Sequence, residues 1–331
     1  MTQPYVSTMW APTDPRWNER VRVLEHRKLG PRDVRAFLDA ARGARAVILR
    51  GSVSFGERYR DLVLAMAAKR LKNRPAVVIT DATWEQSSSA VERRLPARVR
   101  PLVPKLARAA MHLVDSPRVH YCVLSSAEVD TFPGIWGVDP DRVHFTPFPH
   151  TLYDDALDAP TSDGGYVFAG GNSLRDYDLL ESAVAGSGIE VHIAAKWQGK
   201  GSKNIHARVL SHEQFMADLA GCGVCVVPLH RTVRSAGQQT YLNAMALGKL
   251  VIVTDAPGVS DYIEDGVTGV IAAPEPDALR AAIIDALDPE RRDHYREVAA
   301  RGKDAARTRF NEYAYRRELL AIASDAGPGG N

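Results

Sequence analysis

RSAGQQTYLNAMALGKLVIVTDAPGVSDYIEDGVTGVIAAPEPDALRAAI, residues 234–283, contains three segments with different hydrophobic patterns. A turn of small residues at 235–237 precedes QQTYLNAMALG, which predicts a helix that ends at Gly248. KLVIVTD is a continuous apolar run typical of a buried strand, and PDALRAAIIDAL has the period of a helix. Helix, strand and helix in this order predict a parallel sheet covered by helices.

The same alternation of apolar runs and amphipathic stretches extends over most of the chain in both directions. Further strands are predicted at 44–51, 75–82, 118–126, 165–171, 189–197 and 224–229. The stretch 150–165 is polar, bears Asp, Pro and Gly, and has no hydrophobic period, so it predicts a boundary. We therefore expect an α/β fold of two Rossmann-like parallel-sheet domains facing a cleft.

The expected bounds follow from this division. A first domain is predicted over 1–150 and a second over 151–308, and an amphipathic helix should follow over 309–323. Residues 324–331 (SDAGPGGN) are expected to be a disordered tail. In such folds ligands bind at the carboxyl ends of the strands, so the cleft between the domains is the expected site.

Composition and charge exclude several classes of protein. The formal net charge is only +2, which gives no reason to expect nucleic acid as a partner. Three cysteines fit a reducing compartment, and the CxxC of Cys222 and Cys225 reads as two small buried side chains without a second pair to complete a zinc site. No apolar run approaches a membrane span, so a cytoplasmic location is expected.

One basic segment qualifies that expectation. Residues 91–114 carry six cations among apolar residues, a composition that could contact an anionic membrane at its inner face. Three prolines are expected to break helical continuity there, and a solvated basic face is the alternative explanation.

The turn at 235–237 is the first candidate for chemistry. Ala236 and Gly237 precede a helix that begins near Gln238 and Gln239, where unpaired N–H groups and the helix dipole suit a diphosphate. Gly237 would let the backbone approach the phosphate without a side chain between them. An ordinary buried helix with a glycine at its start would show the same spacing.

Two motifs give this region a family resemblance. Asn243-Ala244-Met245-Ala246-Leu247-Gly248 is followed by a strand and by Asp265-Gly266-Val267-Thr268-Gly269. This order resembles the C-terminal signature of GT-B glycosyltransferases, particularly the retaining family 4, from about Arg118 to the last helix. The two glutamates of the family's E-x7-E motif fall on Ser235 and Asn243 here. This departure leaves the donor sugar and the stereochemical outcome open.

The resemblance implies roles for further residues. A glycine-rich turn that carries a cation for the leaving diphosphate corresponds to Gly170, Gly171, Asn172 and Arg175, with Lys196 or Arg234 as a second cation. Donor sugar and ribose contacts fall to Ser235, Thr240 and Asn243, and the nucleobase to Val209 and Leu210. Uridine is the commonest base in the family. The last helix is expected to cross back to the N-terminal, acceptor-side domain.

Asp81 is the candidate catalytic residue. It follows the strand at 75–82, near the position where the family often has a histidine. A carboxylate there could be the general base that an inverting transfer requires, or it could simply cap the following turn.

The sequence thus predicts a glycosyltransferase that moves a sugar from a nucleotide-diphosphate donor such as a UDP-sugar to a small-molecule or lipid-linked acceptor. No cofactor and no metal are expected, because Arg175 and the helix start at Gly237 would neutralise the diphosphate. Two alternatives keep the fold: a non-catalytic module that binds a ligand or partner, and a nucleotide-sugar epimerase.

Overall fold

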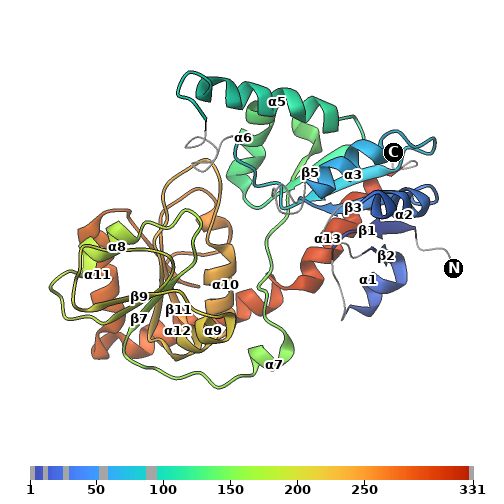
Figure 1. Ribbon diagram of the computed structural model, residues 1–331. Helices are drawn as coiled ribbons and strands as arrows, with labels where there is room; N and C mark the ends of the chain where they lie inside the picture. Colours follow the sequence, from blue (N-terminus) through green and yellow to red (C-terminus); the bar gives the residue numbers. More distant parts are fainter. Residues whose placement is uncertain (1–3, 10–13, 25–29, 52–58, 87–94, 328–331) are drawn as a thin grey trace. The chain divides into compact units, whose positions relative to one another are not determined.

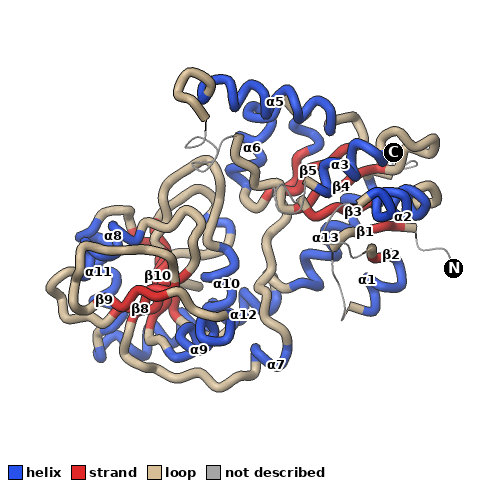
Figure 2. Tube along the Cα trace, in the orientation of Figure 1, coloured by secondary structure: helices blue, strands red, loops and turns tan. Residues whose placement is uncertain are grey.

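The computed structural model describes residues 4–9, 14–24, 30–51, 59–86 and 95–327. It divides into two compact units: unit 1 comprises residues 1–146 and 315–331, and unit 2 comprises 147–314. Each unit contains one six-stranded sheet in which every strand pairing is parallel. Figure 2 shows the strands of each unit in red with helices around them. The predicted architecture, α/β with two parallel sheets, is confirmed.

The sheet of unit 1 has the strand order β2-β1-β3-β4-β5-β6 (Figure 1). Its strands are β1 (Tyr5–Ser7), β2 (Val21–Val23), β3 (Ala46–Arg50), β4 (Ala76–Thr80), β5 (Val119–Val123) and β6 (Val143–Phe145). The helices are α1 (Pro15–Arg20), α2 (Pro31–Ala41), α3 (Arg60–Ala68), α5 (Val103–Val114) and α6 (Ser126–Trp136). The last helix of the chain, α13 (Glu312–Asp325), begins in unit 2 and continues into unit 1.

Both faces of the unit 1 sheet are covered. On β3, Val47 and Leu49 face a core cluster that also contains buried residues of α2, α3, α5 and α6. Ala46 and Ile48 face the opposite cluster, which contains residues of α1 and α13. Because successive side chains of a strand point to opposite faces, a strand buried on both sides must be apolar throughout, as the run AVIL is.

The sheet of unit 2 has the strand order β12-β11-β10-β7-β8-β9. Its strands are β7 (Val167–Gly170), β8 (Val191–Ala194), β9 (Ile205–Arg208), β10 (Val224–Val227), β11 (Leu250–Thr254) and β12 (Val270–Ala272). Its helices are α7 (Asp154–Leu157), α8 (Tyr177–Val184), α9 (His212–Gly221), α10 (Gln238–Ala246), α11 (Pro276–Leu287) and α12 (Arg292–Thr308). Successive strands run outward from β7 to β9 and then return to β10 on the other side of β7. The strand order therefore reverses between β7 and β10, and ligands bind beyond the carboxyl ends of the strands at such a point.

Two local expectations can be compared with the structure. The prolines of the basic segment were expected to break helical continuity, and α5 begins only at Val103, after Pro96 and Pro101. Pro104 lies in the first turn of α5, where no intrahelical N–H donor is needed. The last helix continues to Asp325, so the first two residues of the expected tail are helical.

Within the described ranges, the helices are either too short or too polar to span a bilayer.

Candidate functional site

The start of α10 lies beside the carboxyl end of β10 in unit 2. Gly237, the residue before the helix, has φ of +95°, and a Cβ there would lie 3.2 Å from Val227 Cγ1 and 3.3 Å from Leu229 Cδ2. Only glycine combines this left-handed backbone with such close packing. No side chain caps the helix, so its first turn presents N–H groups that the helix cannot satisfy itself. The predicted diphosphate position is therefore an uncapped helix start with a glycine before it.

Arg175 connects the loop after β7 to the first turn of α10. Its Nε donates to the carbonyl of Gly170 at 3.0 Å, and Nη1 donates to that of Ser173 at 2.7 Å. Nη2 donates to Thr240 Oγ1 at 3.0 Å. Burial lowers the pKa of Arg175 below its ordinary value, although a guanidinium keeps its charge in proteins. A fixed positive charge therefore lies next to the helix N-terminus.

Two glycines make room for these side chains. A Cβ on Gly171, where φ is +103°, would lie 2.8 Å from Arg175 Nη2. A Cβ on Gly170 would lie 2.4 Å from the ring of Phe215, which packs edge-on against Phe168. The glycine pair that ends β7 is therefore required by the packing of a cation on one side and an aromatic ring on the other.

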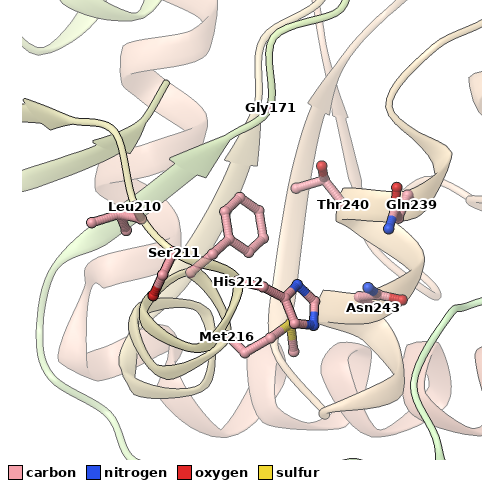
Figure 3. Close-up of a pocket in the computed structure, with 9 residues that line it drawn as sticks. Gly171, Leu210, Ser211, His212, Met216, Gln239, Thr240 and Asn243 are labelled. Carbon is pink, nitrogen blue, oxygen red and sulfur yellow. The ribbon is translucent and has the colours of Figure 1, made fainter. Parts of the chain in front are cut away.

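A pocket of about 230 Å³ opens between α10 and α9 (Figure 3). Its lining residues are Gly171, Leu210, Ser211, His212, Phe215, Met216, Gln239, Thr240 and Asn243. Figure 3 shows Gln239, Thr240 and Asn243 on one side of the pocket, opposite His212 and Met216. The structure thus brings together five residues predicted for diphosphate, sugar or ribose, and base contacts: Gly171, Leu210, Gln239, Thr240 and Asn243.

Asn243 also anchors the segment that enters unit 2. Its Oδ1 accepts a hydrogen bond from Thr151 N at 2.8 Å, and its Nδ2 donates to Thr151 Oγ1 at 3.1 Å. Gln239 Nε2 donates to the same hydroxyl at 3.2 Å. The amide is therefore already engaged by protein groups, and a ribose would have to use the remaining hydrogen-bonding capacity of Asn243.

Ser235 and Gln238 lie in the interior beside the pocket rather than on its lining. Both side chains are buried, and Gln238 Nε2 donates to Ser235 Oγ at 2.8 Å. Ala236 is half-buried in the same turn. These two polar side chains hold the turn that precedes α10, which differs from the direct sugar contact expected for Ser235.

A second, more open pocket of about 620 Å³ lies at the ends of β8 and β9. Its lining residues are Ala195, Lys196, Trp197, Gln198, Ala207, Arg208 and Val209. Asn172 links it to the glycine turn, because its Oδ1 accepts from Lys196 N at 3.1 Å. Lys196 and Val209, predicted for the diphosphate and the base, thus line a different pocket from Leu210 and Asn243.

Helix α9 contributes side chains to the pocket that were not predicted from the sequence. His212, Phe215 and Met216 form one side of the smaller pocket. Ser211 and Gln214 form a capping box at the start of this helix, and that S-x-x-Q pattern is readable in the sequence. Combined with the rule that ligands lie beyond strand ends, the box could have identified His212 as a residue at the site.

Asp81 lies in unit 1 at the carboxyl end of β4, with a left-handed φ of +52°. Its Oδ1 accepts a hydrogen bond from the Tyr315 hydroxyl of α13 at 2.9 Å. Burial raises the pKa of the carboxyl, outweighing the lowering effects of that hydrogen bond and of the Arg50 charge. The carboxylate contacts the last helix rather than capping the turn after it, and non-glycine residues in this conformation gather at functional sites.

In the part of the chain that the structure describes, no group of three or more His, Cys, Asp or Glu side chains lies close enough together to bind a metal ion. Cys122, Cys222 and Cys225 are buried free thiols whose pKa values are raised by burial.

Comparison with known proteins gives this geometry a context. Residues 173–289 match the family model of the glycosyl transferases group 1, whereas no curated protein sequence matches the chain. Anabaena HepE in complex with UDP and glucose is similar in structure, with a TM-score of 0.61 and 13% identity over 93% of this chain and 88% of that one. The chain has the GT-B fold.

Two other solved structures support this assignment. A glycosyltransferase from Rickettsia africae has a TM-score of 0.57 at 11% identity, over 97% of this chain and 89% of that one. Sucrose-phosphate synthase from Thermosynechococcus elongatus has a TM-score of 0.56 at 15% identity, over 92% and 83%. The match at 173–289 includes both motifs that carry the resemblance to GT-B glycosyltransferases, and it supports glycosyl transfer as the class of activity.

Proposed function

We propose that this GT-B protein transfers a glycosyl group from a nucleotide-diphosphate sugar to a small-molecule or lipid-linked acceptor, without a metal ion. The observation that carries the proposal is the junction of β7 and α10. There the Arg175 guanidinium donates to Thr240 in the uncapped first turn of the helix, and Thr240 and Gly171 line the pocket.

The chemistry needs this positive potential at one place. When the bond between the anomeric carbon and the β-phosphate oxygen breaks, negative charge builds on the departing diphosphate. The helix dipole and a buried guanidinium stabilise that charge more than they stabilise the bound donor. A bound Mg²⁺ would serve the same purpose in other enzymes, so transfer by this protein should survive EDTA.

Asp81 is the proposed general base for the acceptor hydroxyl. The acceptor oxygen forms the new bond to the anomeric carbon and loses its proton, which the Asp81 carboxylate takes up. A raised pKa favours this proton uptake, and the Tyr315 hydroxyl fixes the orientation of the carboxylate.

A uridine diphosphate is the proposed leaving group. Its support is the similarity to HepE, whose structures contain UDP. The base would lie near Leu210, which lines the smaller pocket between α9 and α10, or near Val209, which lines the larger pocket at the ends of β8 and β9.

A thermal-shift screen of the full chain tests the donor class, with UDP, GDP, dTDP, CDP, ADP and NAD as ligands. A ligand that binds only the native state at a hundredfold excess over Kd stabilises it by about 2.7 kcal/mol. We expect a clear shift with UDP and none with NAD. A shift with no nucleoside diphosphate would contradict the proposal, and UDP binding without any sugar transfer would favour the non-catalytic module.

Arg175→Gln tests the site itself. A charge-assisted hydrogen bond contributes about 1.5–3 kcal/mol, so the variant should bind UDP about 10- to 100-fold more weakly while binding of uridine changes little. Isothermal titration measures both affinities. Arg296→Gln, on the exposed surface of α12, is the matched control and should leave both unchanged. Equal losses of UDP and uridine affinity would remove Arg175 from the diphosphate role.

A further inference from the structure

The outward side of α5 in unit 1 carries a row of exposed leucines. Leu102, which precedes the helix, is 49% exposed, and Leu106 and Leu113 are each 63% exposed. Their spacings of four and seven residues place them on one side of a helix. Met111 and Val114 occupy the other side and are buried in the unit 1 core. The helix therefore has one packed apolar face and one open one, and Figure 1 shows it at the outer edge of unit 1.

Cations lie near this leucine row, defined as Leu102, Leu106 and Leu113, except that Arg108 is on the opposite side of α5, where its guanidinium lies beside Gly137. Residues 95–114 contain no Asp or Glu, and their four cations, Arg98, Arg100, Lys105 and Arg108, are all exposed. Among the residues whose placement is described, none of the four forms an ion pair. An apolar row with exposed positive charge beside it suits a partner that is negative at its surface and apolar beneath it.

Two other occupants fit this surface less well. A nucleic acid would use the cations but would leave the leucines against a charged backbone. A second copy of the chain would bury the leucines, but a two-fold contact would bring the cations beside them against the same cations of the other copy. Like charges opposed in this way cost binding energy. An anionic bilayer matches both the leucines and the cations.

We propose that the leucine row and three nearby cations, Arg98, Arg100 and Lys105, dock this protein on an anionic membrane surface. The leucines enter the boundary between headgroups and acyl chains, and the cations lie at the level of the lipid phosphates. This membrane partner goes beyond the proposed glycosyl transfer, and it would hold the protein where a lipid-linked acceptor is presented. The surface lies in unit 1, whereas the donor pocket lies in unit 2, so the two can be tested separately.

Flotation of the full chain with lipid vesicles tests the proposal. We expect binding to phosphatidylcholine vesicles that contain a third of phosphatidylglycerol, and weak binding to phosphatidylcholine alone. Lys105→Gln should weaken binding about fivefold, since one cation near an anionic surface contributes about 1 kcal/mol. Leu106→Ser should weaken it about tenfold through loss of apolar burial.

Matched controls separate these effects from surface changes in general. Ile284→Ser removes an exposed apolar side chain from α11, and Arg296→Gln removes an exposed cation from α12; neither should affect flotation. An unchanged melting temperature of each variant shows that it is folded. Absence of vesicle binding by the wild type, or equal binding by Leu106→Ser, would overturn the proposal. Concentration-dependent dimerisation that Leu106→Ser abolishes would assign the surface to a second copy instead.

Discussion

Asp81 combines a strained backbone with a carboxyl group that the fold holds in a poorly solvated place. An aspartate whose pKa is raised in the folded state binds a proton there more tightly than in the unfolded chain. Its contribution to stability is therefore greatest in acid and is lost as the pH rises through the raised pKa, so burial of this carboxyl lowers the free energy of unfolding at higher pH. The protein tolerates this cost at the end of a strand, where ligands bind in such folds.

Asp81→Asn should therefore stabilise the protein while it stops catalysis. Asparagine has no charge to desolvate, adopts left-handed backbone more readily than most residues, and can still accept the hydrogen bond from Tyr315. We expect the melting temperature at pH 7 to rise by about 2 °C, in line with about 1 kcal/mol, and sugar transfer to fall at least a hundredfold. Scanning calorimetry and a transfer assay measure the two effects. Lower stability with normal turnover would assign Asp81 a structural role only.

At the residue scale, the sequence predicts which residues line the pocket better than it predicts which residues contact one another. Gly171, Gln239, Thr240 and Asn243 could be gathered from spacing and resemblance, and they line one pocket. The bond from Asn243 to Thr151 joins residues 92 positions apart, and local pattern carries no information about such a pair. Likewise, nothing in the sequence indicated that Tyr315 would contact Asp81 across 234 positions.

The start of α10 is the element on which the candidate site depends most. Gly237 has both a left-handed backbone and neighbours within 3.3 Å of the position of a Cβ. Gly186, in the loop after α8, has φ of +70° but no atom within 4 Å of that position. Alanine substitutions at these two glycines therefore distinguish the free-energy cost of backbone strain from that of steric crowding.

Gly237→Ala should destabilise the protein by about 2–4 kcal/mol, as the sum of about 1–2 kcal/mol for left-handed backbone and a similar overpacking cost. Gly186→Ala should lower the free energy of unfolding by about 1–2 kcal/mol, because backbone strain is the only cost at this uncrowded position. Urea titration measures both. We also expect UDP affinity to fall in Gly237→Ala only, because displacement of the first turn moves its N–H groups. Equal destabilisation by the two variants would show that Gly237 is not crowded.

Element prediction succeeded where a single physical signal dominated. Central strands such as β4 and β11 are continuous apolar runs because helices cover both faces of their sheets. Three-residue strands such as β1 and β12 have too few residues to show a period. In α5 the prolines were correctly recognised as helix breakers, but their position in or before the first turn makes them compatible with a helix start.

At the scale of the whole molecule, the stability of the fold should depend on pH through a pair of histidines. His120 on β5 and His144 on β6 stack, and His120 Nδ1 lies 2.9 Å from His144 Nε2. Burial lowers the pKa of His120 to about 4, and the charges of His144 and Arg142 lower it further. Burial also lowers the pKa of His144, although the charge of Glu318 on α13 acts in the opposite direction. Both rings are thus held neutral in the folded protein.

The free energy of unfolding should therefore fall as the pH is lowered from about 6.5 to about 4, because the unfolded chain takes up protons that the folded pair resists. The loss should be on the order of 2 kcal/mol. His120→Gln should flatten this part of the profile, whereas His294→Gln on the exposed surface of α12 should leave it unchanged. Urea titration at several pH values gives the profile. A slope that survives in His120→Gln would show that other groups cause it.

The sequence predicts only in part which segments of the chain make up each of the two units. Alternating apolar and amphipathic segments indicate two sheets, and the polar stretch near 150–165 indicates a change between them. The amphipathic pattern of the last helix shows that it must pack on something. It does not show which sheet face receives it, because many apolar faces would accept Leu319 and Ala323 equally well.

The return of α13 has a consequence for how the protein is made. Tyr315, Leu319 and Ala323 cover one face of the unit 1 sheet, yet a ribosome releases them after all of unit 2. During synthesis the β3 and β4 residues on that face have α1 beside them but lack the α13 side chains while some 170 residues of unit 2 emerge and fold. Chaperones that recognise exposed apolar strands would therefore be able to bind unit 1, which is translated first, for longer than unit 2.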